Sequence, residues 1–253
     1  MPRSIYPELI KYFGHLIHSR LSMKPEFKIE RKAMRLLSYD HPDNFYLSPK
    51  LQKIFALHYS EELQTFVTAC GNSIPDNHYH FILTCEESPQ LIINESLHHS
   101  AMANGKKVLA SGSLVFKCGD LVTITNHSGH YRPSDDEMLD VIKALHNASR
   151  GTLLEYQSYC TAEPLIYSVK ELLHTASFSQ VSPIASDELI HPVTGNREKS
   201  GYDFIAGDRA VVSNNRYGAR LKPERTRFFE EVVNNNITSV DEIYHPASSS
   251  SPV

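Results

Sequence analysis

A histidine, a tyrosine and an arginine follow one another in the segment Ser128-Gly129-His130-Tyr131-Arg132-Pro133. His130 can titrate near neutral pH, Tyr131 adds a hydroxyl group, and the guanidinium of Arg132 can bind an anion. Gly129 permits a positive φ angle or the close approach of a ligand. We therefore predict a pocket lined by this segment, suited to acid–base chemistry or to phosphate binding.

A second segment, His99-Ser100, lies upstream, and we expect it to close the same pocket. The catalytic candidates are His99, Ser100, His130, Tyr131 and Arg132. The ligand-binding candidates are Ser128, Gly129, Asp208 and Arg209. The alternative is a structural corner, in which His130 and Tyr131 bond backbone groups and fix the turn.

Basic side chains gather between residues 196 and 227, where eight lysines and arginines stand against four acidic residues. Within this stretch, Asp208 and Arg209 lie near several glycines and are candidates for a second anion site. The stretch has neither the G-x-x-x-x-G-K-[ST] pattern of a P-loop nor G-x-G-x-x-G. A solvated basic loop is therefore the alternative interpretation.

Histidine and cysteine are the residue types that would hold a metal ion. The chain has 14 histidines, several of them in pairs, but no H-E-x-x-H and no C-x-x-C pattern. We predict no metal site and assign no cofactor. The four cysteines, at positions 70, 85, 118 and 160, are irregularly spaced, which is typical of reduced thiols in a cytosolic protein.

The composition is that of a globular protein. The 253 residues are 41% hydrophobic and 21% charged, with a formal net charge of -4, and this length can bury a sizeable core. The weakly acidic balance argues against a nucleic-acid partner. No apolar run reaches the 18 residues of a membrane span, and the first 20 residues lack a secretory signal pattern. We expect the protein to be cytoplasmic in the cell that makes it.

The elements around the SGHYRP segment (residues 128–133) have the clearest local signals. Residues 113–117 and 121–126 are two β-rich runs around a three-residue loop with Gly119, which predicts a β-hairpin. Ser134 and Glu137 then form a capping box. The apolar face of the helix that follows consists of Met138, Val141, Ile142 and Leu145, and Gly151 can end this helix.

The remaining elements complete an α+β fold. Helical spacing predicts helices over residues 5–23, 26–39, 49–66, 164–178 and 224–236, and short strands are expected over 79–84 and 90–94. The predicted architecture has a helical N-terminal part, a central antiparallel sheet whose β-hairpin leads into the capped helix, and a mixed C-terminal part. We expect one domain over 1–238 (helical 1–72, SGHYRP core 78–151, C-terminal extension 152–238) and a flexible tail over 239–253.

Four motifs follow in order from Leu97: His99-Ser100-Ala101, Ala110-Ser111-Gly112-Ser113-Leu114, Gly119-Asp120 and the SGHYRP segment. They resemble the H-S-S, A-G-x-L, D-G and S-G-H-Y-x-P motifs in the central domain of plant IQ-motif calmodulin-binding proteins and of a group of bacterial proteins. The resemblance covers residues 95–148 and implies the same hairpin and helix. Ala101 replaces the second serine, which weakens any role for that hydroxyl, and the Gly-Asp turn is reversed.

Calmodulin binding does not follow from this resemblance. Residues 12–18 resemble the family's R-Y-G-H-N-L-H segment, displaced by one residue. Ile10, His15 and Arg20 fall at spacings related to those of an IQ motif, but its glutamine and its Arg-Gly pair are missing. The resemblance therefore suggests calmodulin as a partner, but this chain lacks the IQ motif that would bind it.

Three functions remain open. The first is a host-directed bacterial effector, exported without an N-terminal signal peptide, because residues 239–253 place acids before a small polar end like the C-terminal signals of type IV secretion substrates. The second is a transferase-like enzyme acting on a phosphate- or nucleotide-containing substrate. The third is a calmodulin-binding or other interaction module. The expected partner is accordingly a host protein or a nucleotide-like small molecule.

Overall fold

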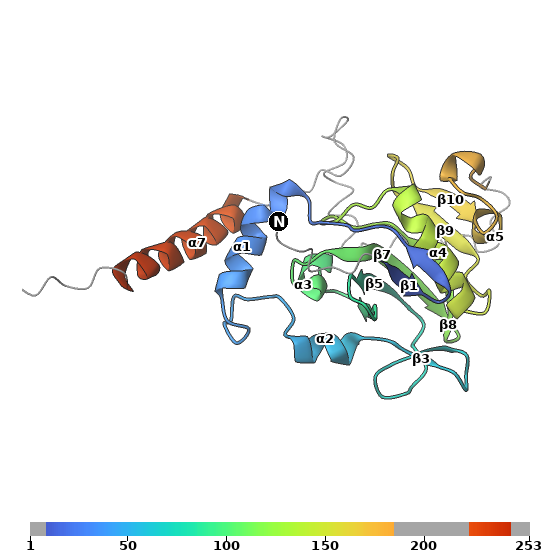
Figure 1. Cartoon of the computed structure of the whole chain (residues 1–253), viewed down its shortest axis with the longest axis horizontal. Coiled ribbons are helices and arrows are strands. Elements are labelled where there is room, and N and C mark those ends of the chain that lie inside the picture. Colours follow the sequence, from blue (N-terminus) through green and yellow to red (C-terminus); the bar gives the residue numbers. More distant parts are fainter. Residues whose placement is uncertain (1–8, 185–222, 244–253) are drawn as a thin grey trace, which may run out of the picture.

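The computed structural model describes residues 9–184 and 223–243, with side chains over 225–235 in the second range. A six-stranded sheet with the order β10-β9-β8-β7-β5-β6 forms its centre (Figure 1). Neighbouring strands are antiparallel except for the parallel pair β8 and β9. The strands are β5 (Asn77–Thr84), β6 (Leu91–Asn94), β7 (Val108–Lys117), β8 (Asp120–Thr125), β9 (Glu155–Ser158) and β10 (Leu165–Ser168).

The predicted hairpin is confirmed as β7 and β8. Its loop has two residues rather than three, because Asp120 already pairs with Lys117 in the sheet. Cys118 and Gly119 have φ angles of 52° and 81°. Two successive positive φ angles fit the tight turn whose twist matches that of the two strands.

Helix α4 (Asp135–Ala148) covers one face of this sheet (Figure 1). Its capping box is confirmed, because the Ser134 hydroxyl accepts from the Glu137 amide and the Glu137 carboxylate accepts from the Ser134 amide. The four side chains of its predicted apolar face are completely buried. Gly151 follows the helix at a φ angle of 83°. The SGHYRP segment thus lies between the β7–β8 hairpin and the capped start of α4.

The helix predicted over residues 5–23 is wrong. The described part of this stretch contains a hairpin of β1 (Ile10–Tyr12) and β2 (His15–Ile17), with Gly14 at a φ angle of 84° in its turn. Ile10 and Ile17 pair across the hairpin and are both buried in the core. Apolar residues at helical spacing lie on the same face of a helix. Here Ile10 and Ile17 lie on the same side for another reason, because the chain reverses between them.

The helix predicted over 49–66 is correct only in its first half. Helix α2 (Pro49–Phe55) begins after Ser48, whose hydroxyl accepts from the Leu51 amide. The chain then becomes extended because the Leu57 amide donates to the Leu91 carbonyl at the edge of the sheet. Strands β3 (His58–Ser60) and β4 (Thr65–Val67) form a second small hairpin.

The helix predicted over 164–178 is wrong for its first part, which is β10, and the rest holds only the short α5 (Val169–Leu172) and the start of η2 (Phe178–Gln180). The helix predicted over 26–39 is confirmed as η1 (Pro25–Phe27) and α1 (Lys28–Leu36). Helix α3 (His99–Ala103) precedes β7. With these corrections, the α+β class and the antiparallel central sheet are confirmed.

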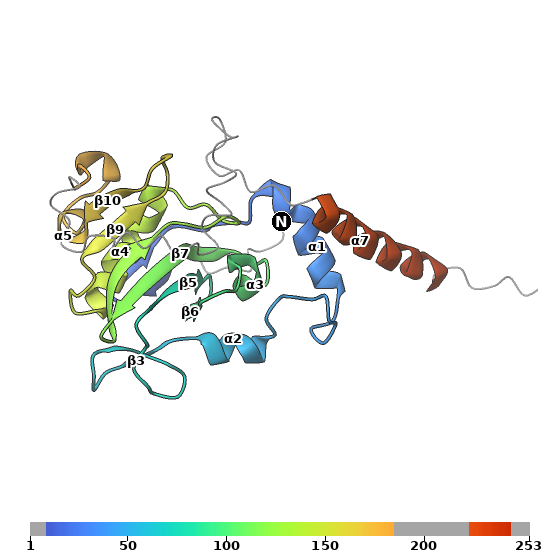
Figure 2. The ribbon, with the colours of Figure 1, turned by 180° about the vertical axis from the view of Figure 1, so that it is seen from behind.

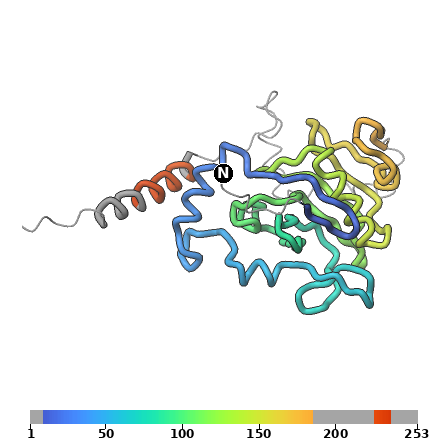
Figure 3. Tube along the Cα trace, viewed as in Figure 1, coloured from blue at the N-terminus to red at the C-terminus, as the bar shows by residue number. Residues whose placement is uncertain are grey.

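The last described element is α7 (Pro223–Ile243), which confirms and extends the helix predicted over 224–236. Its Phe229 and Val233 pack against Ala33 and Met34 of α1. Beyond this contact α7 extends away from the sheet, as seen from both sides of the molecule (Figures 2 and 3).

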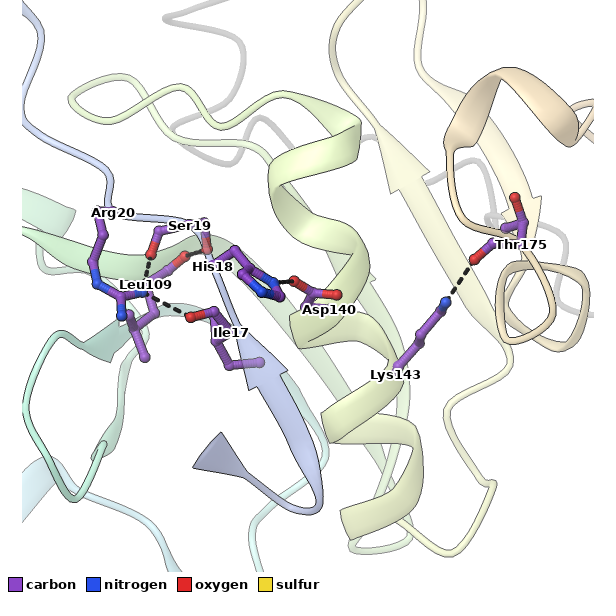
Figure 4. A network of polar contacts seen from close by, with 8 residues as sticks. All are labelled: Ile17, His18, Ser19, Arg20, Leu109, Asp140, Lys143 and Thr175. Atoms are coloured by element: carbon purple, nitrogen blue, oxygen red, sulfur yellow. Dashed lines mark hydrogen bonds and ion pairs between the residues drawn. The ribbon is translucent and has the colours of Figure 1, made fainter. Parts of the chain in front are cut away.

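A polar network joins the segment after β2 to the sheet and to α4 (Figure 4). The Ser19 hydroxyl donates to the Leu109 carbonyl at 2.6 Å, and His18 lies 2.9 Å from the Asp140 carboxylate. The Leu21 amide donates to the Val108 carbonyl at 2.8 Å. These bonds hold residues 18–21 alongside β7. Helix α1 therefore lies at the end of the sheet that carries the SGHYRP segment.

The four cysteines are all free thiols in the structure. Within residues 9–184 and 223–243, no helix has the length and apolar character needed to cross a bilayer.

Candidate functional site

The SGHYRP segment is a tight corner between β8 and α4. The Arg132 amide donates to the Ser128 carbonyl at 3.1 Å, and the Tyr131 amide donates to the Ser128 hydroxyl at 3.4 Å. Arg132 has a φ angle of 48°, in the left-handed region that most side chains avoid. The corner is therefore held by its own backbone bonds.

His130 meets a buried carboxylate from the other end of the sequence. Its Nε2 lies 3.3 Å from Oε2 of Glu30 on α1, and their side chains are 13% and 1% exposed. The His130 ring packs on Phe27 with centroids 4.3 Å apart, and the His98 ring lies 5.7 Å away. The other carboxylate oxygen, Oε1 of Glu30, has no hydrogen-bond partner among the described residues.

Tyr131 and Arg132 also hold other segments in place. Tyr131 is buried, and its hydroxyl donates to the Lys106 carbonyl at 2.7 Å. Arg132 forms an ion pair with Glu26 and donates from Nε to the Gly129 carbonyl at 2.9 Å. The three central side chains of the segment thus contact η1, α1 and the loop after α3.

His99 and Ser100 lie on α3 and are both buried. Nε2 of His99 lies 2.8 Å from the Gly112 carbonyl. Burial lowers the pKa of His99 well below its ordinary value, so its ring is neutral at pH 7 and donates to that carbonyl. The Ser100 hydroxyl has no hydrogen-bond partner among the described residues.

The structure brings His98, rather than His99, into ring contact with His130. The ring of His99 lies instead beside that of His80, with centroids 5.1 Å apart. The predicted ligand-binding residues Asp208 and Arg209 lie outside the described residues. No group of three histidine, cysteine or acidic side chains within the described ranges is placed to hold a metal ion.

Sequence reasoning missed Glu30 and Phe27. Glu30 is 100 positions from His130, so no local pattern joins the two residues. One signal was present in the sequence, because Glu30 falls three and four positions before Ala33 and Met34. An acidic residue on the apolar face of an amphipathic helix calls for a buried partner.

A cavity of about 730 Å³ lies beside this corner, behind the contact made by Tyr131. Its walls come from α1, the segment before η1, Gln52 of α2, the end of β5 with the loop that follows it, and the loop between α3 and β7. They include Met23, Arg31, Arg35, Ile82, Lys106 and Val108. The SGHYRP segment lies behind two of these walls, because the Lys24 amide donates to the backbone carbonyl of His130 and the Tyr131 hydroxyl donates to the backbone carbonyl of Lys106.

The sequence around this hairpin and corner is similar to a known domain. Residues 56–138 match the family model described as the IQ motif-containing protein middle domain. The resemblance inferred from the four motifs is thereby confirmed, and the match begins well upstream of them.

Two relatives from Arabidopsis thaliana share this region. The IQ domain-containing protein IQM2 is 25% identical over 125 residues, which cover 48% of this chain and 20% of that protein. The IQ domain-containing protein IQM3 is 49% identical over 41 residues, which cover 16% of this chain and 9% of that protein. The matched regions thus span a fifth or less of these relatives. No solved structure matches the chain.

Proposed function

We propose that the protein is a binding module in which the SGHYRP segment is a structural corner rather than the centre of a reaction. The observation that carries this proposal is that His130, Tyr131 and Arg132 each contact a different segment of the chain. Polar groups that are bonded to neighbouring segments are less available to a substrate. Their physical effect is to join α1 and the loop before β7 to the sheet.

The second observation concerns the residues expected to complete a catalytic pocket. His99 and Ser100 are buried on α3, and the ring of His99 is engaged with a backbone carbonyl of β7. A nucleophile and its base need access to the reacting atoms. The burial of this pair favours support of the sheet over acid–base chemistry.

The enzyme alternative depends on His130, whose ring is partly exposed and lies next to a carboxylate. A histidine oriented by a buried glutamate can accept and release a proton. In this alternative His130 would exchange the proton with substrate, and Glu30 would orient the ring.

Calmodulin binding is a weaker candidate. Calmodulin targets are amphipathic helices whose apolar face enters a groove. The residues at IQ-like spacings, Ile10 and His15 among them, lie in the β1–β2 hairpin, with Ile10 buried. Binding there would require this hairpin to unfold. A calcium-dependent pull-down on calmodulin is the direct check, and retention would overturn this ranking.

The prediction of a host-directed bacterial effector stays a prediction. It depends on residues 239–253, of which 244–253 lie outside the described residues. A reporter-fusion translocation assay tests it, and unchanged export after deletion of 239–253 would contradict it.

The structural and the catalytic interpretation predict different effects on stability, a loss in the first and little change in the second. If His130 and Tyr131 are structural, then His130→Ala and His130→Asn alter the contact of the buried Glu30, and Tyr131→Phe removes the partner of the Lys106 carbonyl. We expect each to lower the free energy of unfolding by about 1–3 kcal/mol. Urea titrations followed by circular dichroism measure this loss.

A matched control is His18→Asn, because His18 also pairs with a carboxylate but is exposed. It should cost less than about 1 kcal/mol. Unchanged stability in all three corner variants would overturn the proposal and favour the catalytic alternative.

A further inference from the structure

The cavity beside the corner gathers positive charge. Arg31 and Arg35 of α1 line it from one side, and Lys106 and Lys107 line it from the loop between α3 and β7. Arg31 and Arg35 are four positions apart, so their side chains leave the helix on the same face. The cavity also receives Glu86 and Glu87 from the loop after β5, which leaves an excess of cations.

Three of these cations have no acidic partner in the part of the chain that the structure describes. Among the described residues, Arg31, Arg35 and Lys106 have no carboxylate within ion-pair distance. Neighbouring cations at a partly enclosed surface repel one another, and a bound anion relieves that repulsion. Guanidinium groups in addition match the geometry of phosphate oxygens.

The backbone at Gly105 lies close to the side chain of Arg31. A Cβ atom at Gly105 would lie 2.8 Å from Cγ of Arg31 and 2.6 Å from the Tyr46 hydroxyl. Arg35 donates from Nη2 to the Gly105 carbonyl at 3.3 Å. The backbone at Gly105 therefore lies directly against the arginine pair and limits where the two guanidinium groups can go.

Another part of the cavity lining is apolar. Met23, Ile82 and Val108 are buried core side chains that also line its wall. The volume of about 730 Å³ lies within the range of about 300–1,000 Å³ that holds small organic ligands. A wall of cations beside a wall of aliphatic side chains suits a ligand with an anionic end and a less polar end.

We propose that this cavity binds an organic phosphate, with its phosphate groups on Arg31, Arg35 and Lys106 and its organic part on the aliphatic wall. This inference rests on the proposed function, in that the SGHYRP corner holds the walls and the cavity receives the ligand. It adds the chemical class of that ligand.

The experiment is isothermal titration calorimetry of the full chain with two probes, inorganic pyrophosphate and adenosine diphosphate. We expect both probes to bind. Adenosine diphosphate should bind more tightly than pyrophosphate, because only its nucleoside part can contact the aliphatic wall. Binding should weaken as the salt concentration rises. Failure of both probes to bind at millimolar concentration would overturn the inference, and equal affinities would overturn the role of the aliphatic wall.

The arginine pair is tested by the double variant Arg31→Gln/Arg35→Gln. We expect it to weaken binding of both probes about tenfold or more, and tenfold corresponds to about 1.4 kcal/mol. The matched control is Lys28→Gln/Lys32→Gln, which removes two charges from the same helix at the same spacing but from exposed positions outside the cavity lining.

The control should change the affinity less than about twofold, because it alters only the distant field of the protein. Equal losses in the two double variants would overturn the inference, since they would point to net charge rather than to the cavity. Lys106→Gln, which leaves α1 unchanged, provides a second variant should the arginine pair prove necessary for folding.

This test is separate from that of the proposed function. Absent phosphate binding together with destabilised His130 and Tyr131 variants would reject only the ligand. Phosphate binding together with unchanged stability of those variants would reject the structural corner and retain the cavity.

Discussion

The SGHYRP corner and the neighbouring cavity use charged residues in opposite ways. At the corner, Arg132 is paired with Glu26, and His130 lies next to Glu30. In the cavity, Arg31 and Arg35 have no acidic partner among the described residues. Charges that are already paired hold the chain together, whereas cations without an acidic partner are available to a ligand. The rarer sequence motif therefore does not mark the better binding site.

The largest expected effect on stability comes from a substitution in β7, the strand whose Gly112 carbonyl is bonded to His99. A Cβ atom at Gly112 would lie 1.8 Å from the Thr125 carbonyl oxygen, so Gly112→Ala would force β7 and β8 apart. His99 would lose its carbonyl partner in the same movement. We expect a loss of about 4 kcal/mol or more, measured by urea unfolding.

Gly71→Ala is the control, because nothing lies within 4 Å of its added methyl group and only its positive φ opposes the change. It should cost about 1–2 kcal/mol. Similar losses at both positions would contradict the close approach at Gly112.

A smaller effect comes from two histidines whose pKa is lowered in the folded chain, His99 on α3 and His78 on β5. Burial lowers the pKa of His99 well below 6.5, and burial together with nearby His80 lowers the pKa of His78 to about 4. The unfolded chain binds a proton at each position near pH 6.5, while the folded chain does not. Stability is therefore complete above pH 6.5 and falls as the pH drops below it, by up to ~1.4 kcal/mol per pH unit for each excluded proton.

Urea titrations between pH 7.5 and pH 4.5 would measure this slope. The variant His78→Asn should reduce the slope by one proton and leave the cavity unchanged. A slope that stays the same in this variant would show that His78 binds its proton in the folded state as well.

The smallest effect sharpens the comparison within the corner itself. Glu26 and Glu30 lie four positions apart, but the Glu26 side chain is 36% exposed whereas that of Glu30 is 1% exposed. Glu26→Gln should cost less than about 1 kcal/mol, because exposed ion pairs contribute little. Glu30→Gln should cost more, since it alters the buried contact with His130. Thermal melts in low and high salt would compare the two, and a larger loss at Glu26 would contradict this ranking.

The sequence predicted those parts of the structure that depend on nearby residues. Gly119 marked the hairpin turn, and Ser134 with Glu137 marked the start of α4, because a turn and a cap are made within four residues. The β1–β2 hairpin was missed since the apolar pattern of Ile10 and Ile17 fits a helix as well as a reversing strand pair.

The site was predictable only in part, for the same reason. His130, Tyr131 and Arg132 were found, but their partners Glu30, Lys106 and Glu26 come from other segments. The cavity is assembled from five separate stretches of chain, none of which carries a binding pattern of its own.

Helix α1 has three neighbours and only nine residues. One side packs on Phe229 and Val233 of α7, Glu30 reaches His130, and Arg31 with Arg35 faces the cavity. Isolated helices shorter than about 12–15 residues are marginal in water, so α1 depends on these contacts for its existence. Its backbone amides should therefore exchange with solvent as one cooperative unit. When α1 unfolds locally, the cavity wall, the contact with His130 and the packing against α7 are lost together.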